Sequence, residues 1–311
     1  MKKPENENHW RAVKETIESI FGSFMREERL PPVFLEKLCD HYVPLAEQVA
    51  EWRRGKPAGP LLLGVNGAQG TGKSTLAGAL ALALEEMHGM SVAVVSIDDL
   101  YLTKSDREEL AARVHPLLVT RGVPGTHDVA LGCSVLDALS SGEPCAVPRF
   151  EKARDDRAAR SDWTEVSEPV DVIIFEGWCV GARAQDESEL AEPVNALERD
   201  EDADGVWRRY VNDALAGPYV GLFGRFDRLV MLCPPGFECI RDWRGEQEEK
   251  LRQKFLTKGE PLPDGVMDEA GLLRFISHYE RMTHWMLEEM PGRADVVFMM
   301  NRERDIVESR A

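Results

Sequence analysis

One glycine-rich segment combines the residue types and spacing that bind phosphate. Gly67 to Ser74 reads G-A-Q-G-T-G-K-S, follows an apolar run and opens onto a helical pattern. Glycines let the backbone curl so that successive N–H groups point at phosphate oxygens, and the helix N-terminus adds positive potential. This is the P-loop pattern, in which Lys73 reaches the β- and γ-phosphates and the Ser74 hydroxyl binds Mg²⁺. A chance match in a glycine-rich loop is the weaker alternative, because the flanking strand and helix are the context that the motif requires.

The motif predicts two cofactors, ATP and Mg²⁺. A second metal ligand comes from Glu176, which ends the apolar run 170–175 and can hold Mg²⁺ directly or through a water. A carboxylate at the end of a strand can also be an exposed residue without a function, but glutamate is rare beside buried apolar runs. The residues that we expect to bind ATP are Gly67, Ala68, Gln69, Gly70, Thr71, Gly72, Lys73, Ser74 and Thr75.

A second carboxylate follows another strand-like run. Asp98 comes directly after residues 91–97, a nearly continuous β-branched segment. The carboxyl ends of parallel strands line the ligand crevice, so we expect Asp98 to face the P-loop. There it can orient or deprotonate the hydroxyl of a phosphoryl acceptor. The alternative is that Asp98 or Asp99 caps the helix that follows.

A polar and basic section lies between these two carboxylates. Arg149, Lys152, Arg154 and Arg157 place four cations within nine residues of a chain whose net charge is −17. Such a local cluster suits an anionic substrate as well as ATP. The segment 121–128 is also polar, although its Asp128 can simply cap the next helix. Solvated loop charges are the alternative for each of these side chains.

A late helical segment carries two candidate lid arginines. Kinases of this architecture close a lid over the phosphates and supply an arginine to the charge of the transition state. Arg244 is the first choice and Arg241 the second, both in the charged helical pattern 237–256. An ordinary surface helix with i,i+4 ion pairs explains the same pattern equally well.

Strand-like and helical segments alternate along most of the chain. Strands separated by helices indicate βαβ units, so the fold class that we predict is α/β, with a mainly parallel, five-stranded sheet flanked by helices. The order of the strands is not indicated. The expected strands are 61–67, 91–97, 170–175, 228–233 and 294–300, and the expected helices among them are 73–88, 128–141, 237–256 and 268–290.

We divide the chain into a helical extension over residues 1–58 and a phosphate-binding domain over 59–311. The extension has an amphipathic pattern over residues 9–24 and a second helical stretch that Pro44 interrupts, and we expect it to pack on the main domain. Within the main domain we expect a variable insertion near 183–226 and a lid near 236–256. The acidic run inside the insertion is most simply a solvated face.

Composition excludes several classes of function. A net charge of −17 argues against nucleic-acid binding, which normally needs a basic surface. The six cysteines are scattered without a C-x-x-C pair and are expected to be free thiols. No apolar run approaches the ~18 residues of a membrane span, and the N-terminus leads into no apolar signal core. We therefore expect a cytoplasmic protein without membrane or nucleic-acid partners; its oligomeric state is not indicated.

The order of the motifs resembles one family. G-A-Q-G-T-G-K-S-T, S-I-D-D-L-Y, R-G-V-P-G-T-H-D, P-R-F-E-K, W-T-E-V, F-E-G-W and W-R-x-x-Q follow one another over residues 60–300. This set is similar to the D-glycerate 3-kinase family, which belongs to the P-loop kinases related to uridine kinase and phosphoribulokinase. The resemblance implies that Asp98 serves the acceptor hydroxyl and that Arg244 is the lid arginine. The substrate-binding residues that it implies are Asp98, Tyr101, Arg121, His127, Asp128, Arg149 and Lys152.

The function expected from the sequence is an ATP- and Mg²⁺-dependent kinase. Its substrate would be a small anionic metabolite, with D-glycerate giving 3-phosphoglycerate as the first candidate and Lys73, Asp98 and Arg244 as catalytic residues. A nucleoside or a pantothenate-like acceptor is the alternative within the class. A nucleotide-hydrolysing switch or chaperone is the alternative outside it. A GTPase should carry Asn-Lys-x-Asp after a late strand, and residues 301–304 do not match that pattern.

Overall fold

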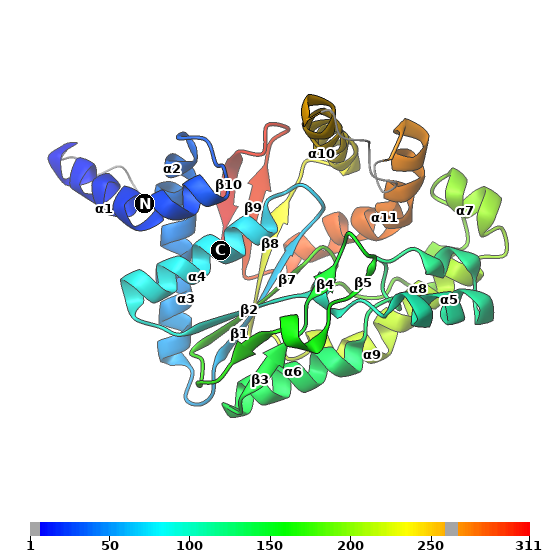
Figure 1. Ribbon diagram of the computed structural model, residues 1–311, viewed down its shortest axis with the longest axis horizontal. Helices are drawn as coiled ribbons and strands as arrows, with labels where there is room; N and C mark the ends of the chain where they lie inside the picture. Colours follow the sequence, from blue (N-terminus) through cyan, green and yellow to red (C-terminus); the bar gives the residue numbers. More distant parts are fainter. Residues whose placement is uncertain (1–6, 259–266) are drawn as a thin grey trace.

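A twisted sheet runs through the centre of the computed structural model, which describes residues 7–258 and 267–311 (Figure 1). In the described residues the sheet has six strands in the order β10-β9-β8-β1-β7-β2. Five of them are parallel, as predicted, and β10 pairs antiparallel with β9. The expectation of five strands was therefore one short. The strands are β1 (Leu61–Gly67), β2 (Val92–Ser96), β7 (Val172–Gly177), β8 (Arg228–Cys233), β9 (Val296–Met300) and β10 (Ile306–Arg310).

Helices cover both faces of this sheet. Alternate residues of a strand point to opposite faces, so Leu61 and Leu63 belong to one core cluster and Leu62 to the other. The first cluster lies under α4 (Lys73–His88) and the N-terminal helices. Every residue of β1 and β7 is buried, which explains why these strands read as continuous apolar runs. The second face is covered by α6 (Val129–Ser141), α8 (Val206–Ala216), α9 (Pro218–Phe223) and α11 (Glu269–Glu289).

The N-terminal helices form α1 (Glu7–Glu27), α2 (Phe34–Lys37), a π-helix (Leu38–Tyr42) and α3 (Val43–Gly55). Pro44 does not interrupt them, contrary to the expectation. It sits in the first turn of α3, where a missing N–H costs no helical hydrogen bond, and the wider π-turn precedes it. Helix α3 ends at Gly55, and the Lys56 ammonium group that follows lies 2.5 Å from the Asp227 carboxylate. Residues 1–6 of the expected extension lie outside the described residues.

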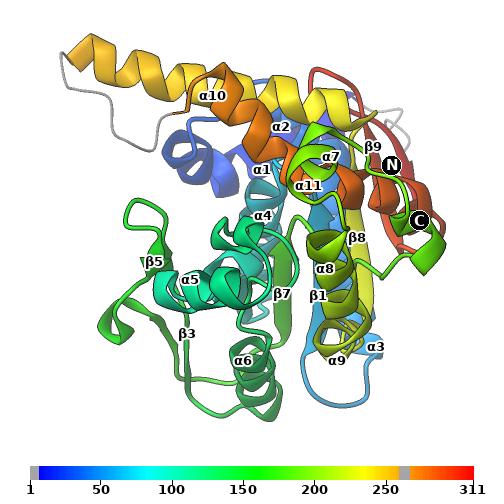
Figure 2. The same cartoon turned by 90° about the vertical axis from the view of Figure 1, so that its right-hand side faces the viewer.

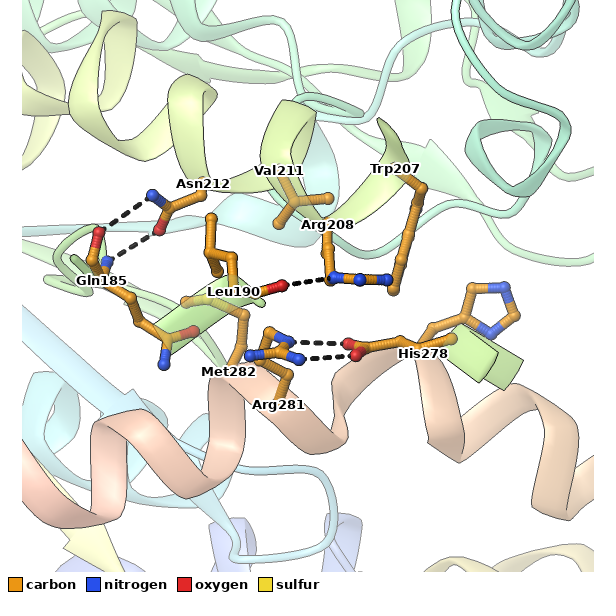
Figure 3. A pocket seen from close by; sticks show the side chains of 10 residues that line it. Gln185, Leu190, Trp207, Arg208, Val211, Asn212, His278, Arg281 and Met282 are labelled. Atoms are coloured by element: carbon orange, nitrogen blue, oxygen red, sulfur yellow. Dashed lines mark hydrogen bonds and ion pairs between the residues drawn. The ribbon is translucent and has the colours of Figure 1, made fainter. Parts of the chain in front are cut away.

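The segment 183–226 folds into α7 (Ala196–Glu201), α8 and α9 beside α11. Its acidic run is not only a solvated face, because Glu198 and Asp202 are almost fully buried. Glu198 binds Arg281 of α11 through two hydrogen bonds of 2.8 and 2.6 Å, and Asp202 pairs with Arg208 of α8. Figure 3 shows both arginines around a cavity of about 10 Å³. The expectation of a solvated face therefore holds for the other acidic residues of the run and fails for Glu198 and Asp202, because buried arginines need carboxylate partners.

Candidate active site

The P-loop connects the end of β1 to the start of α4. Gly70 and Gly72 have φ angles of +83° and +89°, a left-handed conformation that strains any residue with a Cβ atom. A Cβ atom on Gly67 would lie 2.6 Å from the Thr71 hydroxyl, which in turn donates to the Ala68 carbonyl. The glycines of the motif are thus needed for the tight curl of the loop. The curl leads directly into the N-terminus of α4, where anions are stabilised.

Ser74 and Glu176 lie together at the base of this loop. The Ser74 hydroxyl donates to Glu176 Oε1 at 3.0 Å. Glu176 is 5 % exposed, and its Oε2 atom is buried without a hydrogen-bond partner among the described residues. A hydroxyl beside an unsatisfied buried carboxylate oxygen is a fitting donor set for Mg²⁺, which prefers oxygen ligands and keeps several waters. In the described part of the chain no group of three or more His, Cys, Asp or Glu side chains could hold a metal ion.

Asp98 is held between Tyr101 and Lys152 at the end of β2. It lies in a 3₁₀ turn, Ile97–Leu100, directly after β2, and it accepts hydrogen bonds of 2.8 Å from both Tyr101 and Lys152. Burial would raise the pKa of the Asp98 carboxyl, but the charges of Lys73 and Lys152 and the two hydrogen bonds outweigh burial and hold it well below its usual range. Asp98 is therefore ionised at neutral pH.

A cavity of about 270 Å³, the central cavity, joins the P-loop to Asp98. Four cations and one carboxylate line it, although the whole chain is strongly acidic. This concentration of positive charge favours an anionic ligand. The lining residues are Gln69, Gly70, Lys73, Asp98, Tyr101, Arg121, Lys152, Trp178, Arg244, Phe275 and Tyr279.

Of the aromatic residues that line the central cavity, Tyr101 was expected from the sequence, whereas Trp178, Phe275 and Tyr279 were missed. Trp178 and Tyr279 meet edge to face at 4.9 Å, and both anchor the segment 121–128. The Trp178 indole donates to the Gly122 carbonyl, and the Tyr279 hydroxyl donates to the Arg121 carbonyl. A Cβ atom on Gly122 would lie 2.1 Å from the Tyr279 hydroxyl oxygen, so this glycine permits the contact. Trp178 follows the F-E-G motif and could have been noticed, whereas Tyr279 sits in an ordinary amphipathic helix.

Three of the expected substrate-binding residues lie beside the central cavity and do not line it. Arg149 is held by Asp99, whose other oxygen accepts the Phe150 N–H. Asp128 caps α6 at the Leu131 N–H and pairs with Arg157, which is the capping alternative left open above. His127 is buried behind Tyr101, whose ring stacks on it at 4.7 Å.

His127 is a neutral side chain in this position. Burial lowers the pKa of its imidazole to about 4, against a smaller opposite effect of the Asp98 charge. Its Nδ1 atom lies 2.6 Å from the Tyr219 hydroxyl, which also accepts the Gly125 N–H. A neutral Nδ1 can accept the Tyr219 proton, so these groups form a continuous network that supports the floor of the site.

The segment expected to form a lid, 236–256, coincides with most of α10 (Phe237–Lys258), which lies at one end of the molecule in Figures 1 and 2. Arg244 lines the central cavity, pairs with Glu248 at 2.5 Å and lies over the Phe275 ring. Arg241 is exposed and pairs with its neighbour Asp242. Trp243 packs against Gly70, where a Cβ atom would lie 2.9 Å from the Trp243 Cβ. The helix therefore contacts the P-loop directly.

A parallel sheet with this loop at the end of its central strand, and a cation-rich cavity beside the loop lysine, define the class of P-loop kinases. A D-glycerate 3-kinase from Cryptococcus neoformans has a similar structure, with a TM-score of 0.71 and 26% identity over 86% of this chain and 97% of that one. The chain is also 34% identical over 239 residues to an uncharacterized kinase of Schizosaccharomyces pombe, covering 73% of this chain and 81% of the relative. The chain belongs to the D-glycerate 3-kinase-like family of P-loop kinases.

Two further comparisons complete this assignment. A chloroplastic D-glycerate 3-kinase of Arabidopsis thaliana is 37% identical over 163 residues, which cover 47% of this chain and 36% of the plant protein. No family model matches the chain. None of the described helices combines the length and apolar character that a bilayer crossing needs. The cytoplasmic location stays a prediction, since the plant relative is named for the chloroplast.

Proposed function

We propose that this chain transfers the γ-phosphoryl group of ATP to a hydroxyl of a small anionic metabolite, with D-glycerate as the first candidate and 3-phosphoglycerate as its product. The observation that carries the proposal is the central cavity, in which Lys73 and three further cations surround the ionised Asp98. Its volume of about 270 Å³ lies just below the ~300–1,000 Å³ typical of sites for drug-sized ligands and suits a small acid. Two relatives named D-glycerate 3-kinase support the choice of acceptor.

The donor half of the proposed site consists of the P-loop and its neighbours. The loop amides and Lys73 would hold the phosphates, while Ser74 and Glu176 would hold Mg²⁺. When bound, the metal would offset negative charge on the phosphates. Lys73 also faces Asp98 across the central cavity, so the transferring group lies between them.

In the acceptor half, Asp98 accepts the hydrogen bond of the substrate hydroxyl. Its lowered pKa makes it a weak base, so its main contribution is to aim an oxygen lone pair at the γ-phosphorus. The bond from the acceptor oxygen to phosphorus forms, the bond to the bridging oxygen breaks and ADP leaves. The hydroxyl proton passes to Asp98 and then to solvent. A loose transition state needs little help from a base before bond formation.

The remaining cations have distinct proposed tasks. Arg121 and Lys152 line the central cavity and would bind the carboxylate of the acceptor. Arg244 would offset the charge of the transferring phosphoryl group. Asp99 accepts hydrogen bonds from both Arg149 and the Phe150 N–H, and so the pair of Arg149 and Asp99 positions the loop that carries Lys152. His127 and Asp128 would hold the end of the segment 121–128 in place through Tyr219 and Arg157.

A panel of small acceptors tests this proposal. The purified protein is incubated with ATP and Mg²⁺ and with D-glycerate, uridine or pantothenate, and ADP and the phosphorylated product are measured together. We expect equal amounts of ADP and 3-phosphoglycerate with D-glycerate and no ADP without an acceptor. A preference for uridine or pantothenate would overturn the acceptor. ATP hydrolysis that needs no acceptor and responds only to a protein partner would overturn the kinase.

A further inference from the structure

A second and larger cavity borders the opposite side of the P-loop. It has a volume of about 670 Å³, and we call it the N-terminal cavity because residues 30–42 form much of its wall. Thr71, Gly72 and Thr75 line it, whereas Lys73 lines the central cavity. Different residues of the loop and of the first turn of α4 therefore line the two cavities. The volume is within the range of sites that hold small molecules and cofactors.

The positions of these two cavities indicate where each phosphate of a bound nucleotide would lie. The backbone of a P-loop cradles the α- and β-phosphates, while its lysine reaches the β- and γ-phosphates. The γ end of ATP therefore lies in the central cavity beside Lys73. The α-phosphate and the nucleoside attached to it lie toward Gly72 and Thr75, on the side of the N-terminal cavity.

The chemistry of the N-terminal cavity differs from that of the central cavity. Glu36, Asp40, Glu303 and Asp305 line it together with only two residues that carry permanent positive charge, Lys37 and Arg304. This balance disfavours another anionic group and suits an uncharged one. Carboxylates accept hydrogen bonds from ribose hydroxyls. The apolar surface for a flat base comes from Leu30, Pro31, Val33, Phe34 and Ile306.

The wall built by residues 30–42 is firmly attached to the end of the sheet. Figure 1 shows the N-terminal helices beside β9 and β10, although the two regions lie far apart in the sequence. The Lys37 ammonium group donates to the Arg304 carbonyl at 2.7 Å, and the His41 ring lies 5.9 Å from that of Phe298. Arg304 itself donates to the Gly70 carbonyl of the P-loop. The wall and the P-loop are thus both bonded to Arg304.

We propose that the N-terminal helices supply one wall of the nucleoside pocket of the donor site, so that the helical extension is part of the ATP-binding machinery. The proposal rests on the proposed function, because it requires ATP on the P-loop. It assigns a role to a segment outside the motifs that identify the family. It also predicts that affinity for the nucleoside and affinity for the phosphates can be changed separately.

Binding of ATP and of inorganic tripolyphosphate, each with Mg²⁺, tests this division. The variants are Asp40→Ala, which changes an exposed lining residue, and Phe34→Leu, which reduces the apolar wall. In both we expect the Kd for ATP to rise about tenfold, which corresponds to about 1.4 kcal/mol, with the Kd for tripolyphosphate unchanged. Glu47→Ala, an exposed acidic residue of α3 that does not line the cavity, is the matched control and should change neither Kd.

Several outcomes separate this inference from the proposed function. Wild-type protein that binds ATP no more tightly than tripolyphosphate would overturn the nucleoside pocket and leave the kinase standing. Unchanged ATP affinity in Asp40→Ala and in folded Phe34→Leu would do the same, as would equal losses for both ligands. Lys73→Ala should weaken both ligands. Protein that binds neither ligand would overturn the proposed function itself.

Discussion

At the scale of single residues, the site depends on one carboxylate held ionised among cations. One carboxylate oxygen of Asp98 accepts a hydrogen bond from Tyr101 and the other accepts one from Lys152, and the charge of Lys73 acts from the P-loop. An oxygen in this state is a good hydrogen-bond acceptor and a poor base. The arrangement therefore favours orientation of the acceptor over its deprotonation.

The substitution Asp98→Asn tests the role of this charge. Asparagine keeps the shape but can neither take up a proton nor carry a negative charge. We expect kcat to fall by about 10²-fold or more, because the acceptor hydroxyl loses the charged oxygen that orients it and receives its proton. Affinity for ATP should stay or increase, because a negative charge near the phosphates is removed; equilibrium binding measures it. Turnover close to that of the wild type would remove Asp98 from the mechanism.

The acid side of the pH profile tests the cause of the lowered pKa. Lys152→Met removes a charge and a hydrogen bond that hold the pKa of Asp98 down, so that pKa must rise. Protonation then begins at a higher pH, and the acid limb of kcat/KM should move to higher pH in the variant. Arg154→Met is the control, because Arg154 is an exposed cation of the same loop that does not line the central cavity. A limb that stays in place would show that Lys152 does not set the charge of Asp98.

At the scale of elements, the P-loop is clamped by α10 and by the turn after β9. Trp243 of α10 packs on Gly70 and donates to the Arg302 carbonyl. Arg304 of the turn donates to the Gly70 carbonyl and pairs with Glu246 of α10. The loop, the lid helix and the turn therefore meet around one glycine, and a change there should affect all three.

Gly70→Ala tests this contact. The added Cβ atom would lie 2.9 Å from Trp243 in a backbone with φ of +83°, so both strain and displacement of α10 are expected. We predict at least a tenfold rise in the Kd for ATP, measured by titration calorimetry. Gly59→Ala is the matched control, since Gly59 has φ of +70° but its added Cβ atom would lie no closer than 4.0 Å to Ser140. If both variants weaken ATP binding equally, general backbone strain is the cause.

The elements were predictable to different degrees, for physical reasons. Of the five parallel strands, β1 and β7 are buried on both sides and β2, β8 and β9 are partly or mostly buried, so all five appear as apolar runs. Helix α4 is bounded by Gly72 and Gly89. Strand β10 was missed because four of its five residues are exposed and its composition is that of a loop. Among site residues, those beside the P-loop and at strand ends were found by position. Phe275 and Tyr279 were not, since an aromatic residue on an amphipathic helix looks the same in a core and in a cavity wall.

At the scale of the whole molecule, charge is distributed unevenly. The chain carries a net charge of −17, yet four cations and one carboxylate line the central cavity. The negative charge on the rest of the chain repels anions, so the central cavity is the favoured place for an anionic ligand. Part of the acidity is also structural. In the segment 183–226 the buried pair of Glu198 and Arg281 joins α7 to α11, the helix that carries Tyr279 to the site.

The buried ion pair between Glu198 and Arg281 leads to a prediction about stability. In Glu198→Gln the Arg281 guanidinium would stay buried without its counter-charge, which costs on the order of 3–5 kcal/mol of unfolding free energy. The matched control is Glu201→Gln on the same helix, where the pair with Arg274 of α11 is about half exposed and contributes about 0–1 kcal/mol. Urea denaturation at neutral pH measures both.

The same two variants separate stability from chemistry. Glu198 lines neither of the two cavities beside the P-loop, so at temperatures where the protein is folded the kcat of Glu198→Gln should equal that of the wild type. Equal stability losses in the two variants would contradict a special role of the buried pair. A kcat that falls in fully folded Glu198→Gln would show that the packing of α7 on α11 positions Tyr279 and Phe275, and that the insertion takes part in shaping the acceptor site.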